Sequence, residues 1–142
     1  MLQSFVTEES KVAPVYVTSE VMFMTQGPER TLTAWIVKNY QPVPRGLVFQ
    51  LTADRSFYEA AALDLQTRGL ADGTLHFEKD DVVTVKVLPA YTQMFVQTAR
   101  YLAFRNQHER AITAFEQALL LDPNLKQAQQ GRDESRSRIA SP

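Results

Sequence analysis

The chain has 142 residues, of which 44% are hydrophobic and 22% are charged, and it contains no cysteine. This composition is that of a folded protein and excludes an intrinsically disordered chain. Fifteen basic side chains stand against sixteen acidic ones, so the formal net charge is -1. A near-neutral chain lacks the positive field that attracts nucleic acid or anionic membranes, and the lack of cysteine excludes disulfides, thiolate metal sites and cysteine nucleophiles.

The first 53 residues alternate between helical and strand-like patterns. The Ala13-Pro14 step ends a short amphipathic helix, because a residue before proline avoids helical geometry. A strand, a helix and a second strand then follow within about 40 residues, which predicts a βαβ unit with parallel pairing. The expected elements are a helix over 2–11, a strand over 14–24, a helix over 27–40 that carries Leu32, Trp35, Ile36 and Tyr40 at helical spacing, and a strand over 45–53.

The next segment predicts one more helix and two more strands. Ser56 and Glu59 have the spacing of a capping box, in which each side chain satisfies a terminal amide of a helix, and this helix is expected to run to Thr67. Alternating apolar residues predict strands over 74–78 and 82–88, joined by a hairpin turn at "KDD". Residues 1–88 are therefore expected to form a mixed body of the α+β or α/β class.

Residues 89–142 read as three helices with short joins. The third helix is polar nearly all round, as expected of a terminal helix that caps a helical stack. No apolar run in the chain is long enough to span a membrane, and the first residues lack the pattern of a signal peptide. A complete chain of this kind would be cytoplasmic, whereas a fragment of a membrane protein would be extracytoplasmic.

Within this helical part, residues 92–125 resemble a tetratricopeptide repeat, a helical hairpin of 34 residues. In the second helix and its exit, the small, aromatic and proline positions of the repeat are matched. Thr98 departs from the usual leucine, and Asn106 occupies the turn where glycine is usual. The matched residues of the second helix and its exit are Ala111, Phe115, Ala118 and Pro123, whereas in the first helix Phe95 stands where tryptophan is common, Leu102 where tyrosine is common and Ala99 where a small residue is usual.

The resemblance implies a protein-interaction module. A single repeat cannot bury both of its apolar faces, so it must pack on a protein partner, on its parent chain or on a second copy in a homo-oligomer. Arg100 lies on the expected inward face of the first helix with Gln93, Val96 and Ala103. Repeats of this family hold a peptide carboxylate with a basic and an asparagine residue on that face, contributed by several repeats, and of these four residues only Arg100 has suitable chemistry. The expected partner-binding residues are Phe95, Val96, Arg100 and Phe104.

A second resemblance covers the order of elements. "PVYVT" at residues 14–18 and "PRGLVFQL" at residues 44–51 are similar to segments in the soluble C-terminal region of multi-span membrane proteins related to protein O-mannosyltransferases. This resemblance implies that glycosyl transfer would belong to a membrane part, and that this chain would be a non-catalytic accessory domain.

Motifs for catalysis, metal binding or cofactor binding are lacking. His76 and His108 have no triad or metal-ligand spacing, and the acidic cluster at residues 78–81 is typical of a solvated turn. No catalytic residue, metal ligand or cofactor is therefore expected. The alternative is a small α/β ligand-binding or enzymatic domain with its site at the carboxyl ends of parallel strands, where the residues would be Thr18, Ser19 and Asp54.

Overall fold

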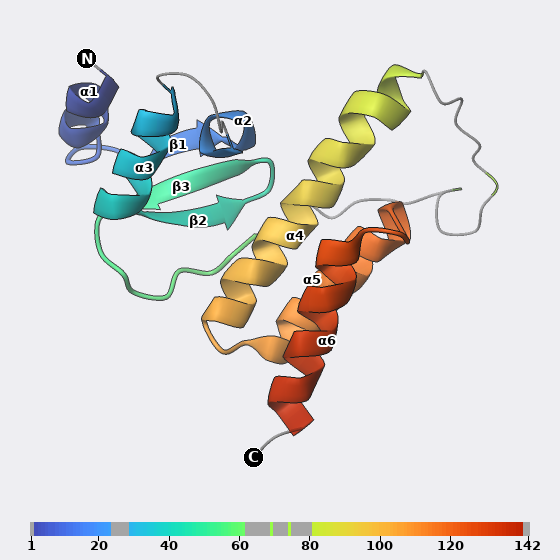
Figure 1. Ribbon diagram of the computed structural model, residues 1–142. Coiled ribbons are helices and arrows are strands. Elements are labelled where there is room, and N and C mark those ends of the chain that lie inside the picture. The colour runs from blue at the N-terminus through green and yellow to red at the C-terminus, as the bar shows by residue number, and fades with distance from the viewer. Residues whose placement is uncertain (1, 24–28, 62–68, 70–73, 75–80, 141–142) are drawn as a thin grey trace. The chain divides into compact units, whose positions relative to one another are not determined.

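A computed structural model describes residues 2–23, 29–61, 69, 74 and 81–140 of the chain (Figure 1). The chain forms two compact units, Met1–Ala61 and Ala62–Pro142. The predicted division at residue 88 falls inside the second unit, where a π-helical segment joins a long α-helix. The first unit contains the strands of the described chain and the second is helical, so the α+β class is confirmed.

In its described residues, the first unit contains three helices and a three-stranded sheet. All strand pairs are antiparallel, and the strand order is β1-β3-β2. The expected parallel pairing of the strands over 14–24 and 45–53 is therefore wrong. The corresponding strands, β1 and β3, do pair, but they are antiparallel because the β2–β3 hairpin reverses the chain direction before β3. The elements are α1 (Leu2–Glu9), β1 (Val15–Thr18), α2 (Ser19–Phe23), α3 (Glu29–Asn39), β2 (Gln41–Arg45) and β3 (Val48–Thr52).

Two of these elements differ from the sequence prediction. The strand expected over 14–24 ends at Thr18, and the residues after it form the short helix α2. The single strand expected over 45–53 is the second arm of a hairpin whose first arm is β2. Gly46 has a φ of 66° at the turn, a conformation that glycine adopts without steric cost.

The two prolines of β2 are compatible with a strand because β2 is at the edge of the sheet. Pro42 is opposite Leu51 and Pro44 is opposite Phe49. Since proline has no N–H, these must be the positions of β2 whose backbone groups point away from β3. The backbone N–H of Ala61 donates to the carbonyl of Pro44 at 3.1 Å, which covers part of this outer edge.

The core of the first unit lies between the sheet and the helices α1, α2 and α3. Ile36 of α3 is fully buried, and Tyr40, directly after this helix, is 6% exposed, as their helical spacing predicts. The ring of Tyr40 also contacts the ring of Trp35, with 5.6 Å between the centroids. The buried cluster consists of Val6, Met22, Ile36, Tyr40, Phe49 and Leu51.

The helix expected to start at Ser56 is not formed there. Residues 56–60 are irregular, and the remainder of that prediction lies outside the described residues. The Ser56 N–H donates to Oδ1 of Asp54 at 2.8 Å, which places Ser56 in a turn after β3. Of the strand expected over 74–78, Thr74 is described and is not in a strand, and the rest lies outside the described residues.

The second unit is helical from Val82 onward. The strand expected over 82–88 is wrong, because Val82 is helical and the segment η1 (Val83–Val87) is a π-helix that leads into α4 (Leu88–Phe104). Asp81 precedes it and accepts hydrogen bonds from the next helical turn, at 3.3 Å from Thr84 N and at 3.0 Å from Val85 N. This capping fixes a helical start that outweighs the preference of valine for strands.

Three α-helices follow Val87 in the described part of the second unit (Figure 1). These are α4, α5 (His108–Leu121) and α6 (Lys126–Ala140), which agree with the predicted helices. Asn106 has a φ of 58° between α4 and α5, the left-handed conformation expected of this turn. No helix in the described part of the chain is long and apolar enough to cross a membrane.

The packing of α5 depends on small residues and one aromatic ring. Its buried residues are Ala111, Ala114, Phe115 and Ala118, and its neighbours are α4 and α6. A Cβ atom added at Gly131 of α6 would lie 2.2 Å from Cζ of Phe115. Glycine at this position therefore allows the ring to lie directly against the backbone of α6.

Candidate interaction groove

An open groove of about 330 Å³ lies among the three helices of the second unit, and we call it the α4–α6 groove. All three helices contribute to its lining, and most of the lining side chains come from α6. The lining residues are Arg100, Ala103, His108, Phe115, Gln127, Gln130, Gly131, Glu134, Ser135 and Arg138.

The lining of this groove combines a buried base with exposed polar side chains. Phe115 is 2% exposed and Ser135 is also 2% exposed, so both are fixed in the packed unit. Gln130, Glu134 and Arg138 are exposed on α6. The spacing of Gln127, Gly131, Glu134 and Arg138 places them along one face of this helix. A ligand in the groove would thus meet a fixed base and polar side chains that can adjust to it.

The charge of the groove is set by Arg100, Arg138 and Glu134. Nη2 of Arg100 donates to Oε1 of Gln127 at 3.2 Å, which links α4 to α6 across the groove. Nδ1 of His108 is buried and has no hydrogen-bond partner within the described ranges. Two guanidinium groups against one carboxylate make the groove a better host for a carboxylate or a carbonyl oxygen than for a cation.

The four residues that were expected to bind a partner differ in exposure and in whether they line the groove. Arg100 is exposed and lines the groove, as its predicted inward position implies. Phe95 is 5% exposed and Val96 is fully buried, so these two are packing residues and the expectation of an exposed face around Phe95 is wrong. Phe104 is 80% exposed but does not line the groove.

Phe104 belongs to a small aromatic group near the end of α4. The guanidinium carbon of Arg105 lies 5.8 Å from the centroid of the Phe104 ring and 5.7 Å from that of Tyr101. Both distances are within the range of cation–π attraction. The exposed ring of Phe104 therefore contacts Arg105 at the end of α4, whether or not it also binds a partner.

Most of the α6 residues in the groove were not found from the sequence, because a polar helix was interpreted as solvated. The available signal was the set Ala128, Gly131 and Ser135, small residues at helical spacing within a polar helix. Ala128 is fully buried and Ser135 is 2% exposed. The structure places His108 half-buried at the start of α5.

The alternative site at the carboxyl ends of strands is not assembled. Thr18 pairs with Val48 at the start of β3, whereas Asp54 follows the end of β3. Because β1 and β3 are antiparallel, Thr18 and Ser19 lie at one end of the sheet and Asp54 lies at the other. The three residues named for this site therefore cannot act on one ligand.

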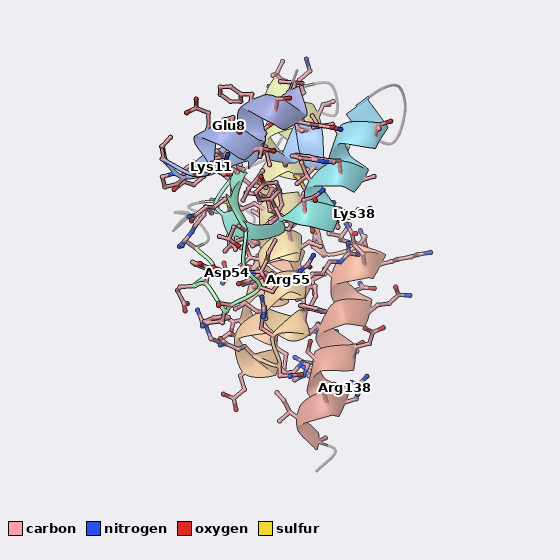
Figure 2. All side chains as sticks on the ribbon, turned by 90° about the vertical axis from the view of Figure 1, so that its left-hand side faces the viewer. Glu8, Lys11, Lys38, Asp54, Arg55 and Arg138 are labelled. Carbon is pink, nitrogen blue, oxygen red and sulfur yellow. The ribbon has the colours of Figure 1, made fainter. Side chains whose placement is uncertain are left out.

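Asp54 has a structural explanation of its own, and Figure 2 labels it in the loop after β3. Oδ2 accepts a hydrogen bond from the Tyr58 hydroxyl at 2.7 Å, and Oδ1 accepts one from the Ser56 N–H at 2.8 Å. The hydrogen bond from Tyr58 is the largest cause that lowers the pKa of Asp54, followed by those from Ser56. The carboxylate thus fixes the loop that follows the sheet.

In the described part of the chain, no group of three or more His, Cys, Asp or Glu side chains could hold a metal ion. His76 and the acidic residues Glu78 and Asp80 lie outside that part of the chain, while Asp81 caps the helical start described above.

Comparison of the chain with protein-family models, with curated proteins and with solved structures finds no match.

Proposed function

We propose that this chain is a non-catalytic protein-interaction module that binds a peptide segment of a partner in the α4–α6 groove. The observation that carries the proposal is the groove itself, which is lined by side chains of three helices and linked by the hydrogen bond between Arg100 and Gln127. Concave sites with a few convergent polar groups are the usual places where proteins bind ligands.

The resemblance of residues 92–125 to a tetratricopeptide repeat supports this proposal. The resemblance places Arg100 on the face that binds peptides in that family, and Arg100 lines the groove. The positions expected to be small or aromatic, Ala99, Ala111, Phe115 and Ala118, are all buried. In this proposal α6 takes the place of the next repeat and closes the helical stack with a polar outer face.

The side chains of the groove favour a peptide with a carboxylate. Arg100 and Arg138 offer planar guanidinium groups, which bind carboxylates with two parallel hydrogen bonds. Gln127 and Gln130 add amide groups that can pair with peptide backbone. The partner segment is therefore an acidic peptide or the C-terminus of a protein.

The source of this peptide is a separate protein or the parent chain of this domain. The second resemblance, to the soluble region of membrane proteins related to protein O-mannosyltransferases, involves residues that form β1 and the β2-β3 hairpin. In that setting the module would be an extracytoplasmic accessory domain, and glycosyl transfer would belong to the membrane part of the parent.

The test is a peptide array of acidic and C-terminal sequences, followed by fluorescence anisotropy with the peptides that bind. Arg100→Ala removes a charge-assisted contact worth about 1.5–3 kcal/mol, so the dissociation constant should rise roughly ten- to hundredfold. Arg136→Gln is the matched control, because Arg136 is on α6, pairs with Glu116 at 2.9 Å and does not line the groove. Equal binding by the Arg100 variant, or no binding peptide at all, would contradict the proposal.

A further inference from the structure

The outer edge of β1 carries backbone groups without a described partner. On β3, the residues opposite Gln41, Val43 and Arg45 must hold the hydrogen bonds to β2, because Pro42 and Pro44 have no N–H to donate. The alternate residues Phe49 and Leu51 therefore bond to β1, where they are opposite Val17 and Val15. It follows that the N–H and C=O groups of Tyr16 point away from the sheet.

The two edges of this sheet are treated differently by the sequence. The β2 edge has prolines at both outward positions and a hydrogen bond from Ala61 to Pro44, and both features prevent further strands from pairing. The β1 edge reads "VYVT" and contains neither a proline nor a charge. Among the residues that the structure describes, none bonds to the outward backbone groups of Tyr16. Exposed edges of this kind pair with other strands.

We propose that β1 pairs antiparallel with β1 of a second copy of this chain, which joins two three-stranded sheets across a twofold axis. The pairing is centred on Tyr16, so that the outward N–H and C=O groups of Tyr16 in the two copies exchange hydrogen bonds. Val15 of each copy then forms a close, non-hydrogen-bonded pair with Val17 of the other. This surface belongs to the first unit and is independent of the α4–α6 groove.

Charges on either side of β1 favour a second copy as the occupant. Lys11 precedes β1 and Glu20 follows it, and both side chains are exposed. Antiparallel pairing brings the start of one strand beside the end of the other, so Lys11 of each copy approaches Glu20 of the other copy. Lys11 bonds within its own chain to Glu8 of α1 at 2.9 Å, a surface pair whose two residues Figure 2 labels and that yields easily to a new partner.

A neighbouring apolar side chain adds to this surface. Val12 is 81% exposed in the turn between Lys11 and β1. The twofold pairing places Val12 next to the start of α2 in the other copy, where part of its surface would be removed from water. The interface is still small, since only four residues of each strand take part, and a weak dimer with a dissociation constant of about 10–200 μM is expected.

The first experiment uses the full chain and the variant Tyr16→Pro. Proline at this position removes the outward N–H and leaves the bonds of Val15 and Val17 to β3 intact, as Pro42 and Pro44 do on the other edge. The matched control is Tyr16→Thr, which loses the same aromatic ring but keeps the N–H. Sedimentation velocity from about 5 μM to 500 μM should show a concentration-dependent dimer for the parent chain and for Tyr16→Thr. For Tyr16→Pro the dissociation constant should rise at least tenfold, with an unchanged circular dichroism spectrum.

A charge exchange gives a second measure that does not depend on how well the proline variant folds. Lys11→Glu and Glu20→Lys should each weaken the dimer about threefold or more, because each creates two like-charge pairs across the axis. The double variant restores opposite charges and should regain the dissociation constant of the parent chain. A monomer at all concentrations, a dimer unchanged by Tyr16→Pro, or a double variant no better than the single ones would each overturn the proposal.

Discussion

Replacing Gly131 with alanine measures how closely α6 packs on α5. The added Cβ would lie 2.2 Å from Cζ of Phe115 and 2.7 Å and 2.8 Å from its two Cε atoms. Carbon atoms in contact prefer a separation of about 3.5–4.0 Å, so the ring or the helix must shift by more than about 1 Å. The Phe115 side chain is 2% exposed and has little free space to enter.

Two opposing effects set the size of the change in stability. Glycine in a helix interior is less favourable than alanine by about 0.8–1 kcal/mol, so the substitution would stabilise an uncrowded helix. Overpacking in a buried region costs about 1–3 kcal/mol, and three contacts below 3 Å place this case in the upper part of that range. We expect Gly131→Ala to lower the free energy of unfolding by about 1–2 kcal/mol, the reverse of the usual effect.

Urea denaturation followed by circular dichroism at 222 nm measures this change, since the fluorescence of Trp35 reports the first unit. The control Gln130→Ala changes an exposed neighbour on α6 and should move the midpoint little. In a Phe115→Leu background the same Gly131→Ala change should cost less or become stabilising, because the shorter side chain removes the overlap. An unchanged or higher midpoint for Gly131→Ala in the parent chain would refute the proposed packing of Phe115 on α6.

Two further predictions concern loop residues, one in each unit. Asn106 has a φ of 58°, a left-handed conformation that glycine adopts freely and alanine does not. Asn106→Gly should therefore leave the thermal midpoint nearly unchanged, and Asn106→Ala should lower the free energy of unfolding by about 1 kcal/mol. A thermal midpoint unaffected by alanine would contradict this explanation. The folded-state pKa of Asp54 lies below the ordinary 3.8 because of the hydrogen bonds from Tyr58 and Ser56. The Asp54 carboxylate therefore stabilises the fold above the unfolded-state pKa, and this stabilisation is lost as the pH falls through the folded-state pKa. Asp54→Asn should therefore lower the thermal midpoint slightly at neutral pH, and the two proteins should converge in acid; a gap that persists there would exclude the ionised carboxylate as the cause.

The helical unit could be predicted from sequence because its signals are local. Asp122, Pro123 and Asn124 mark the end of α5, and the Asn124 N–H does bond to Oδ1 of Asp122 at 3.1 Å. Asn106 marks the turn before α5, and apolar residues at helical spacing indicate the buried faces. Each of these features depends on residues a few positions apart, which is the range over which helix geometry is determined.

The sheet of the first unit was harder to predict because its order depends on distant residues. In a local pattern Pro42 and Pro44 argue against a strand, although they are well suited to an edge position. Whether β2 is at the edge depends on β3 pairing with β1, and Val15 and Leu51 of that pair are 36 positions apart. Local patterns indicate which segments are extended, but the choice of neighbours is made by burial of Phe49 and Leu51 in the core.

The groove shows the same limit for a candidate site. Arg100 could be found because the repeat pattern assigns it to an inward face, whereas its partner Gln127 is 27 positions away on another helix. A polar helix such as α6 has two possible meanings, a solvated end or the wall of a polar groove, and its mean hydropathy is the same in both. What distinguishes them is the small residue at the contact: Gly131 admits the ring of Phe115, which brings α6 close enough for Gln127 to reach Arg100. A glycine within a polar helix therefore points to a packed helix, and the polar residues at helical spacing from it are the first to test for binding.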